Sequence, residues 1–505
     1  MFSPLDWLVI VLYFLAMAWI GWHFSRGNRD LKDFMFGGGS MPWLAVGISL
    51  IATSISASTF LGNPSYAYTH DMRLLMLGFG SLSAIFVIGW VFIPRFKAAG
   101  IASAYELLEH RFSRPVRLMA AGLYSCHLMM RVGMLMYVPS LVIKEMIGQP
   151  IVVSIVLMAV GSIVYTYFGG IRAIAWTDVM QFVIFMGSGV LVILFCAHAV
   201  GGVGETFRLA SAAGKTRWFD GTWDPASATN IWSAGLVYIV FEVAIRGCDQ
   251  QFVQRYLACR SAAEANKSSI TSVLLGVCVG LVFYSVGAAL FVYFKVKAVV
   301  PLPEGLTGNE VFPYFIMNIL PTGLKGLLGA AILGEAMSSL NSTYSALSNT
   351  TVVDFLGRKD SVEGGEAPGS LKSAKLWVVI WGALGTGMAF ICALGSQTIL
   401  NKALFFTSLF TGPLLGLFLL AFFRPSLHPK AVLAGAVLGM LALLPFLQIP
   451  VLPEGMWKPL YTFAWPWNPV ISLTATVMFA NALGLVWKTS PPVAHPIHQG
   501  LHQAE

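Results

Sequence analysis

Long apolar runs constrain this chain more than any other feature of its sequence. A helix that crosses the hydrocarbon core of a bilayer needs about 20 mostly apolar residues. Thirteen stretches meet that requirement: 6–24, 41–68, 73–94, 116–147, 150–169, 174–200, 229–254, 269–294, 322–353, 375–396, 401–423, 429–449 and 468–487. These runs are continuously apolar rather than alternating, which excludes a closed β-barrel. The sequence therefore predicts an all-α polytopic membrane protein with about 13 transmembrane helices.

The composition of the 505-residue chain agrees with this prediction. Hydrophobic residues make up 57% of the chain and charged residues 11%, whereas a soluble domain carries roughly 25% charged residues. A soluble globular enzyme, a disordered chain and a nucleic-acid-binding module are thereby excluded. We expect one membrane domain over residues 1–490 and a polar cytoplasmic tail over residues 491–505. The formal net charge of +8 is typical of cytoplasmic loops that face anionic lipid.

The distribution of positive charge predicts the orientation of the chain. Asp6 is the first charge of the sequence, whereas Arg26, Arg29 and Lys32 follow the first run. Because positive residues favour the cytoplasmic side, the N-terminus is expected outside, and thirteen spans then place the C-terminus in the cytoplasm. Nearly twice as many Lys and Arg residues fall on the resulting inner segments as on the outer ones. No small-residue cleavage site follows the first run, so we do not expect a signal peptide.

The second run is apolar at both ends and polar in the middle. Residues 53–59 read TSISAST, and GNP follows at 62–64. Pro64 removes a backbone donor and clashes with the preceding turn, so the helix is expected to break or kink there. A discontinuous helix exposes carbonyl oxygens and a helix end at membrane depth, the geometry with which transporters bind ions and substrates. The alternative is that these small hydroxyl residues only allow close helix packing.

A second hydroxyl-rich face lies on the ninth run. Helical spacing places Ser338, Asn341, Ser342 and Ser345 on one stripe. Hydroxyl-rich faces on two separate helices suit a hard cation such as sodium, because hard cations prefer oxygen ligands. Neutral ligands also hold a monovalent ion weakly enough to release it. Interhelical packing is the alternative for this face as well.

Two acidic residues interrupt otherwise apolar runs. Asp178 lies near the cytoplasmic end of the sixth run, as either a carboxylate favoured by the helix dipole or a cation ligand near the inner exit. Glu335 lies one turn before the serine pair at 338–339, and it could pair with an arginine, tune a cation site or carry a proton. Ionisable groups are costly in a bilayer, so both residues need partners or a function.

Arg131 lies near the centre of the fourth run, too far from either end for its side chain to reach water by snorkelling. A guanidinium binds carboxylates through a bidentate fork, which favours a role in binding an anionic substrate. The alternative is a structural ion pair with Glu242 or Glu335. Glu242 and Arg246 are themselves spaced to pair on one helical face, and Gly247 beside them could permit a break in the seventh run.

Four stretches of the chain together resemble the sodium:solute symporter family. They are FMFGGGSMPW at 34–43, GGIRAIAWTDVMQ at 169–181, DQQFVQRYLA at 249–258 and AMSSLNSTYSALSNTTVVDF at 336–355. The resemblance implies a leucine-transporter-like fold with two inverted repeats of five helices each. The first repeat would span 41–200 and the second 229–423, with a peripheral helix at 6–24 and two additional helices at 429–487.

The resemblance also implies where sodium, the coupling ion, binds. The family's main sodium site uses backbone carbonyls and two serine hydroxyls, which correspond here to Ala52, Ile55, Glu335, Ser338 and Ser339. Some members have a second sodium site, which corresponds here to Asp178, Asn341 and Ser342.

Within the family, the chain looks most like bacterial sialic acid transporters. Arg131 matches the arginine that holds the substrate carboxylate in those proteins, and Ser54, Ser56 and Thr59 match polar positions near it. Phe405 stands where the family's sugar transporters place a polar residue. The resemblance thus implies a sodium symporter that imports a small organic anion, such as a sialic acid, by alternating access across a bacterial inner membrane.

Other functions remain open at this point. A short monocarboxylate, or a neutral solute such as a sugar or proline, would suit the same fold. A membrane sensor would need a large soluble signalling region, a sodium channel would conduct far faster than a carrier, and a membrane-embedded enzyme would need a clustered nucleophile, base or metal set. We expect no enzyme active site, no nucleic-acid partner and no obligate protein partner.

Overall fold

The computed structural model describes residues 2–25, 30–357, 370–394, 398–447 and 459–487. Within these ranges the chain is helical, apart from loops and an isolated bridge between Met41 and Cys259. The α-helices are α1 (Pro4–Ser25), α2 (Leu31–Phe36), α3 (Trp43–Ser54), α4 (Ala57–Thr69), α5 (Leu77–Val87), α6 (Ile93–Ala99), α7 (Glu106–Arg111), α8 (Arg114–Ile147), α9 (Ile151–Val200), α10 (Val203–Ala212), α11 (Tyr238–Cys248), α12 (Gln250–Ala258), α13 (Ala262–Phe291), α14 (Gly308–Asn318), α15 (Leu324–Thr350), α16 (Ser370–Leu394), α17 (Thr398–Phe423), α18 (Pro429–Leu443) and α19 (Trp467–Val486). Shorter π-helical segments extend several of them, at Ile88–Phe92, Ile231–Val237, Val292–Val296 and Thr351–Phe355.

Every predicted apolar run coincides with helix in the structure. The runs at 150–169 and 174–200 are the two parts of α9, which Gly170 separates with a φ of 61° and a ψ of −177° that an L side chain rarely adopts. By length and hydropathy, nine of the described helical segments could cross a membrane, or ten if the bent pair α3 and α4 counts as one span. The number of thirteen spans therefore stays a prediction.

The predicted discontinuity in the second run is present, but its predicted position at 62–64 is wrong. The helix stops at Ser54, Ile55 and Ser56 are extended, and α4 begins at Ala57 with a bend of 61° between the two helical parts. Pro64 instead lies inside α4. The break falls within the hydroxyl-rich stretch, where side chains compete for backbone bonds: Thr53 and Ser54 donate to the carbonyls of Ser49 and Leu50.

Packing explains why α4 continues through its proline. Gly287 of α13 faces Pro64, and a Cβ at that glycine would collide with the carbonyl of Pro64. One turn earlier, the ring of Phe60 packs against Phe185, Phe283 and Phe312, with centroids 5.4, 5.1 and 5.5 Å away. Close contact with three other helices therefore holds α4 straight across a residue that would weaken an isolated helix.

The seventh run is also broken, at Asp249. This residue ends α11 and begins α12 in an extended conformation, and its Oδ1 accepts a hydrogen bond of 2.8 Å from the amide of Gln251. An aspartate whose side chain caps the next helix is a strong helix-start signal. The break that Gly247 suggested thus lies two residues further along, where the capping side chain is.

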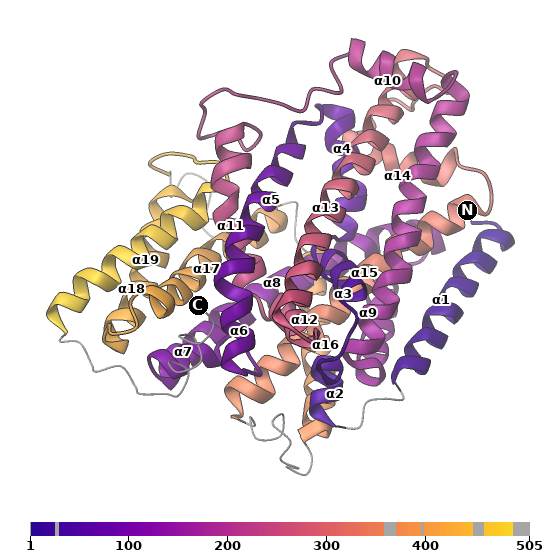
Figure 1. The fold of residues 1–505 in the computed structure, drawn as a ribbon. Helices are drawn as coiled ribbons and strands as arrows, with labels where there is room; N and C mark the ends of the chain where they lie inside the picture. Colours follow the sequence, from indigo (N-terminus) through magenta and orange to yellow (C-terminus); the bar gives the residue numbers. More distant parts are fainter. Residues whose placement is uncertain (1, 26–29, 358–369, 395–397, 448–458, 488–505) are drawn as a thin grey trace.

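The two broken helices meet near the centre of the molecule. Figure 1 shows α1 at one edge of the bundle and the α18–α19 pair at the opposite edge, with α3, α9, α12 and α15 between them. In this central region α15 packs against α9, and α12 packs against both α3 and α15. Both breaks are therefore placed beside the polar faces of α9 and α15.

The long loop between α10 and α11 is hydrogen-bonded to the end of α4. Lys215 Nζ donates to the carbonyls of Tyr68 and His70 at 2.7 and 2.8 Å, and Arg73 forms an ion pair of 2.9 Å with Asp220. Hydrogen bonds from Thr222, together with Arg73, lower the pKa of the Asp220 carboxyl to about 2. The segment between α10 and α11 is thus a tethered structure above this end of the bundle.

A polar network between the broken helices

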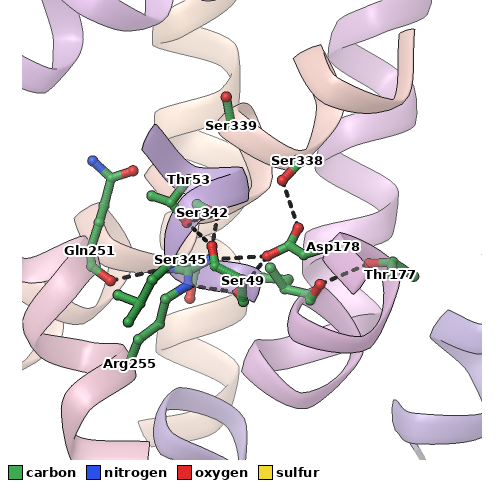
Figure 2. A network of polar contacts seen from close by, with 12 residues as sticks. Ser49, Thr53, Thr177, Asp178, Gln251, Arg255, Ser338, Ser339, Ser342 and Ser345 are labelled. Carbon is green, nitrogen blue, oxygen red and sulfur yellow. Dashed lines mark hydrogen bonds and ion pairs between the residues drawn. The ribbon is translucent and has the colours of Figure 1, made fainter. Parts of the chain in front are cut away.

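Asp178 of α9 is the centre of a buried polar network. Its side chain is fully buried, and its two oxygens are shared between two other helices: Ser338 of α15 donates to Oδ1 at 2.6 Å and Ser49 of α3 donates to Oδ2 at 2.5 Å. Figure 2 shows these side chains pointing toward one another from separate helices. The carboxylate therefore joins α3, α9 and α15 at one point.

Arg255 of α12 completes this network. Its guanidinium donates to Ser49 at 2.8 Å, to Ser342 at 2.6 Å and to Asp178 at 3.4 Å (Figure 2). The predicted seventh run ends at residue 254, just before this arginine, whereas α12 continues to Ala258 and only 1% of Arg255 is exposed. Arg255 thus neutralises the Asp178 carboxylate inside the protein.

The residues predicted for the main sodium site belong to the interrupted end of α3 and to α15. Ser339 Oγ donates to the carbonyl of Ile55 at 2.9 Å, so α15 directly contacts the interrupted end of α3. Ala52 is fully buried one turn before that end. The last carbonyls of a helix have no partner within the helix. The structure therefore brings together carbonyl and hydroxyl oxygens of the kind that a sodium ion needs, while Ser338 is turned toward Asp178.

The residues predicted for the second sodium site are held differently. Asp178 and Ser342 both contact Arg255, and Thr53 lies 3.4 Å from the Ser342 hydroxyl. Asn341 uses its side-chain oxygen to accept a hydrogen bond of 3.0 Å from Thr166. In this conformation a guanidinium, rather than an open space, lies between the carboxylate and Ser342.

Arg131 of α8 makes no ion pair with either carboxylate that the sequence suggested. Within the described residues, Glu242 pairs with Arg246 at 2.6 Å, and the Glu335 oxygens have no hydrogen-bond partner. The charged group that acts on Arg131 is Asp249, at the α11–α12 break. Arg131 is therefore a half-buried cation beside a helix break, with its hydrogen-bonding capacity still available among the described residues.

Other predicted substrate residues line the same region. Ser54, at the end of α3, accepts a bond of 3.4 Å from Arg246, whose guanidinium also contacts Ser272 and lies over the Phe252 ring. Ser56 is buried within the break, and Thr59 is in the first turn of α4. The side chain of Phe405 lies outside the described residues.

Ser49, Thr53 and Arg255 are the members of the network that the sequence prediction missed. Arg255 lies within the DQQFVQRYLA stretch, and its spacing from the Asp249 cap places it on the second turn of a helix. A helix assignment that began at Asp249 would have moved Arg255 from a loop into the membrane domain. Ser49 carried no such signal, since a single serine in an apolar run is common.

Comparison with known proteins finds relatives that match most of this chain. The model of the sodium:solute symporter family matches residues 34–442. The chain is 30% identical to the sodium/sialic acid symporter SiaT of Proteus mirabilis, over 88% of this chain and 89% of that protein. It is also 30% identical to the sodium-coupled monocarboxylate transporter 1 of Xenopus laevis, over 87% of this chain and 71% of that protein.

Solved structures show the same fold. A substrate-bound, outward-open sodium-coupled sialic acid symporter superposes with a TM-score of 0.85 and 27% identity, and the match covers 97% of this chain and all of that one. A nucleobase-cation-symport-1 family transporter superposes with a TM-score of 0.61 at 13% identity, which bears on the fold alone. The expected leucine-transporter-like fold is therefore confirmed.

Proposed function

Because this chain belongs to the sodium:solute symporter family, it is a sodium-coupled membrane transporter and not an enzyme, and we propose that it imports an organic anion of the sialic acid type. The observation that carries the choice of an anion is Arg131. This guanidinium lies half-buried in the middle of α8 and has no ion-pair partner among the described residues. A buried cation without a partner is costly, so a substrate carboxylate that binds it gains a strong, directional interaction.

The similarity to sodium/sialic acid symporters supports the choice of substrate. Two bacterial relatives carry that name, from Proteus mirabilis and Aliivibrio fischeri. A short monocarboxylate is the second candidate, because sodium-coupled monocarboxylate transporters are relatives at similar identity and their substrates would use the same arginine. The hydroxyl-bearing Ser54, Ser56 and Thr59 favour the sugar acid, since a monocarboxylate has few groups for them to bind.

The mechanism that we propose is alternating access driven by sodium. The Ile55 carbonyl at the end of α3 accepts a hydrogen bond of 2.9 Å from the Ser339 hydroxyl of α15, and both oxygens belong to the expected main site. An ion bound between them would join these helices and favour the conformation that accepts substrate from outside. Coupling requires only that sodium bind the outward-facing and inward-facing conformations with different affinity.

The same proposal includes the placement of the chain in the membrane. We place the N-terminus outside and the C-terminus in the cytoplasm of a bacterial inner membrane, following the distribution of positive charge. The two repeats would occupy 41–200 and 229–423, each beginning with one of the broken helices. The additional helices at 429–487 would pack outside the repeats.

Substitution of Arg131 tests the substrate assignment. In proteoliposomes, Arg131→Ala should abolish sodium-driven uptake of sialic acid and reduce binding by at least roughly tenfold, since the loss of a charge-assisted bidentate contact exceeds about 1.4 kcal/mol. The measurement is uptake of labelled substrate, with Arg208→Ala as the control because Arg208 forms only an exposed pair with Glu205. Unchanged affinity of Arg131→Ala for the carboxylate would exclude the anion hypothesis.

Substitution of Ser339 tests the main sodium site. Ser339→Ala removes a hydroxyl that contacts Ile55 and should raise the sodium concentration for half-maximal uptake severalfold, because a neutral oxygen ligand is lost. Ser348→Ala is the matched control on the same helix, since its hydroxyl donates to the Ala374 carbonyl outside the site. Equal sodium dependence in the two variants would contradict the assigned site.

A further inference from the structure

The carboxyl group of Glu335 is a buried acidic group to which the described residues offer no hydrogen bond and no ion pair. Only 1% of Glu335 is exposed, and neither side-chain oxygen has a hydrogen-bond partner among them. The one charged group that acts on it is Asp178, which has the same sign. Because a lone carboxylate inside a membrane protein is strongly unfavourable, Glu335 can be ionised there only beside a positive charge that the described chain does not supply.

Two more buried side-chain oxygen atoms lie beside the same turn of α15. They are the hydroxyl of Tyr13 on α1 and the side-chain carbonyl of Gln181 on α9, both buried. Gly334, the residue before Glu335, shows that they are adjacent: a Cβ there would collide with the Tyr13 hydroxyl and lie 3.3 Å from Cγ of Gln181. The charge of Glu335 also acts on Tyr13. Tyr13 also interacts with the Gln181 side chain, so three helices bring oxygen atoms to one small region.

A cavity adjoins this region. It has a volume of about 360 Å³ and lies between α1, α9 and α15, with Tyr13 and Gln181 in its wall. Asn341 and Tyr165 are the other residues of that wall with polar side-chain groups. The rest of the wall is apolar, so the cavity marks free space beside Tyr13 and Gln181 rather than a water site.

We infer that the Glu335 carboxylate, the Gln181 carbonyl oxygen and the Tyr13 hydroxyl hold a sodium ion at a site separate from the main one, to which Glu335 would contribute only its backbone carbonyl. The inference rests on the proposed function, since it adds an ion to a sodium-coupled transporter. An all-oxygen set suits a hard cation. A monovalent ion matches the single unneutralised charge, because Arg255 already neutralises Asp178. The site makes α1, which the sequence prediction treated as peripheral, a contributor to ion binding.

Equilibrium binding of ²²Na⁺ to the purified full-length protein tests the inference. In Glu335→Gln, which keeps the size of the side chain and removes its charge, bound sodium should fall by about one ion per molecule. In Tyr13→Phe, the sodium concentration that half-saturates this site should rise roughly tenfold, as for the loss of one direct ligand. Tyr165→Phe is the matched control: Tyr165 lines the same cavity, but its hydroxyl is bonded to Thr177 at 2.7 Å, so sodium binding should not change.

The Ser339→Ala variant separates this inference from the proposed function. If Ser339→Ala weakens sodium binding while Glu335→Gln and Tyr13→Phe bind as the wild type does, the Glu335 site is refuted and sodium symport stands. If wild-type protein binds no sodium, both fail. If Glu335→Gln leaves bound sodium unchanged but removes a dependence of thermal stability on pH in sodium-free buffer, a proton occupies the position and the inference is overturned. Should Glu335→Gln not fold, Tyr13→Phe and its Tyr165→Phe control decide the question.

Discussion

Arg255 brings a fixed positive charge to the place where the sequence predicted a second sodium ion. Its guanidinium contacts both Asp178 and Ser342, two of the three residues assigned to that ion. A guanidinium and a sodium ion would compete for the same carboxylate. In the conformation described here, the arginine therefore acts as a built-in counter-ion for Asp178, and a second sodium could bind there only after Arg255 moves away.

Removal of this arginine gives a prediction at the residue scale. Arg255→Gln should lower stability in sodium-free buffer by about 3 kcal/mol, because breaking a buried pair leaves an uncompensated charge. Sodium should then stabilise the variant more than the wild type, since an ion can replace the lost guanidinium. The measurement is the melting temperature in sodium and in choline, with Arg208→Gln, an exposed pair, as the control. An equal sodium effect in wild type and Arg255→Gln would show that the carboxylate does not attract the ion.

At the scale of elements, the two broken helices are interrupted for different reasons. The α11–α12 break has a local cause, the Asp249 side chain that caps the second helix. The α3–α4 break does not, since the residue that breaks isolated helices, Pro64, lies inside α4. The helix is interrupted within the hydroxyl-rich stretch at 53–59, whereas contacts with α13 keep the turn that contains Pro64 helical. Helix packing thus decided which of two weak points in one run became the break.

The contact between α4 and α13 can be tested through Gly287. A methyl group there would collide with the Pro64 carbonyl and lie 2.8 Å from Cβ of Ala67, so Gly287→Ala should separate the two helices and destabilise the protein by about 1–3 kcal/mol, the usual range for overpacking. Gly122→Ala on α8 is the control, because nothing lies within 4 Å of the added methyl group. That change should be neutral or stabilising by up to about 1 kcal/mol through helix propensity. Thermal unfolding in detergent measures both, and equal melting temperatures would contradict the packing argument.

At the scale of the whole molecule, the number of sodium ions determines how transport responds to the membrane potential. One sodium ion with a monoanion is electroneutral, whereas an additional ion at Glu335 makes each cycle carry one net positive charge inward. A potential of about 100 mV, negative inside, then contributes about 2.3 kcal/mol per cycle.

Uptake under an imposed potential measures that charge. In proteoliposomes with a potassium diffusion potential, negative inside, wild-type uptake of the anion should be faster than at zero potential. Glu335→Gln should lose most of this acceleration and keep its response to the sodium gradient. Tyr165→Phe, which alters the same cavity without altering the site, should behave as the wild type does. Uptake by the wild type that is indifferent to the potential would limit the cycle to one sodium ion per monoanion.

Much of the fold followed from local properties of the sequence. Continuous apolar runs are sufficient to predict membrane helices, because each helix satisfies its own backbone and the bilayer selects for apolar side chains. The polar residues within those runs, such as Asp178, Arg131 and Glu335, were identified for the same reason, since a charge in that setting must have a partner or a function. The family followed from four motifs of fixed order.

The sequence alone therefore determined that this protein is a helical membrane protein and where its unusual residues lie along the chain. Only the tertiary structure decided their partners: Asp178 with Ser49, Ser338 and Arg255, Arg246 with Ser54, and Glu335 with no side chain among the described residues. The physical reason is that hydropathy and helix propensity act over neighbouring residues, whereas hydrogen bonds and ion pairs depend on distances between helices that are far apart in sequence. Those distances are set by how the helices pack, and the sequence of one apolar run does not determine that packing.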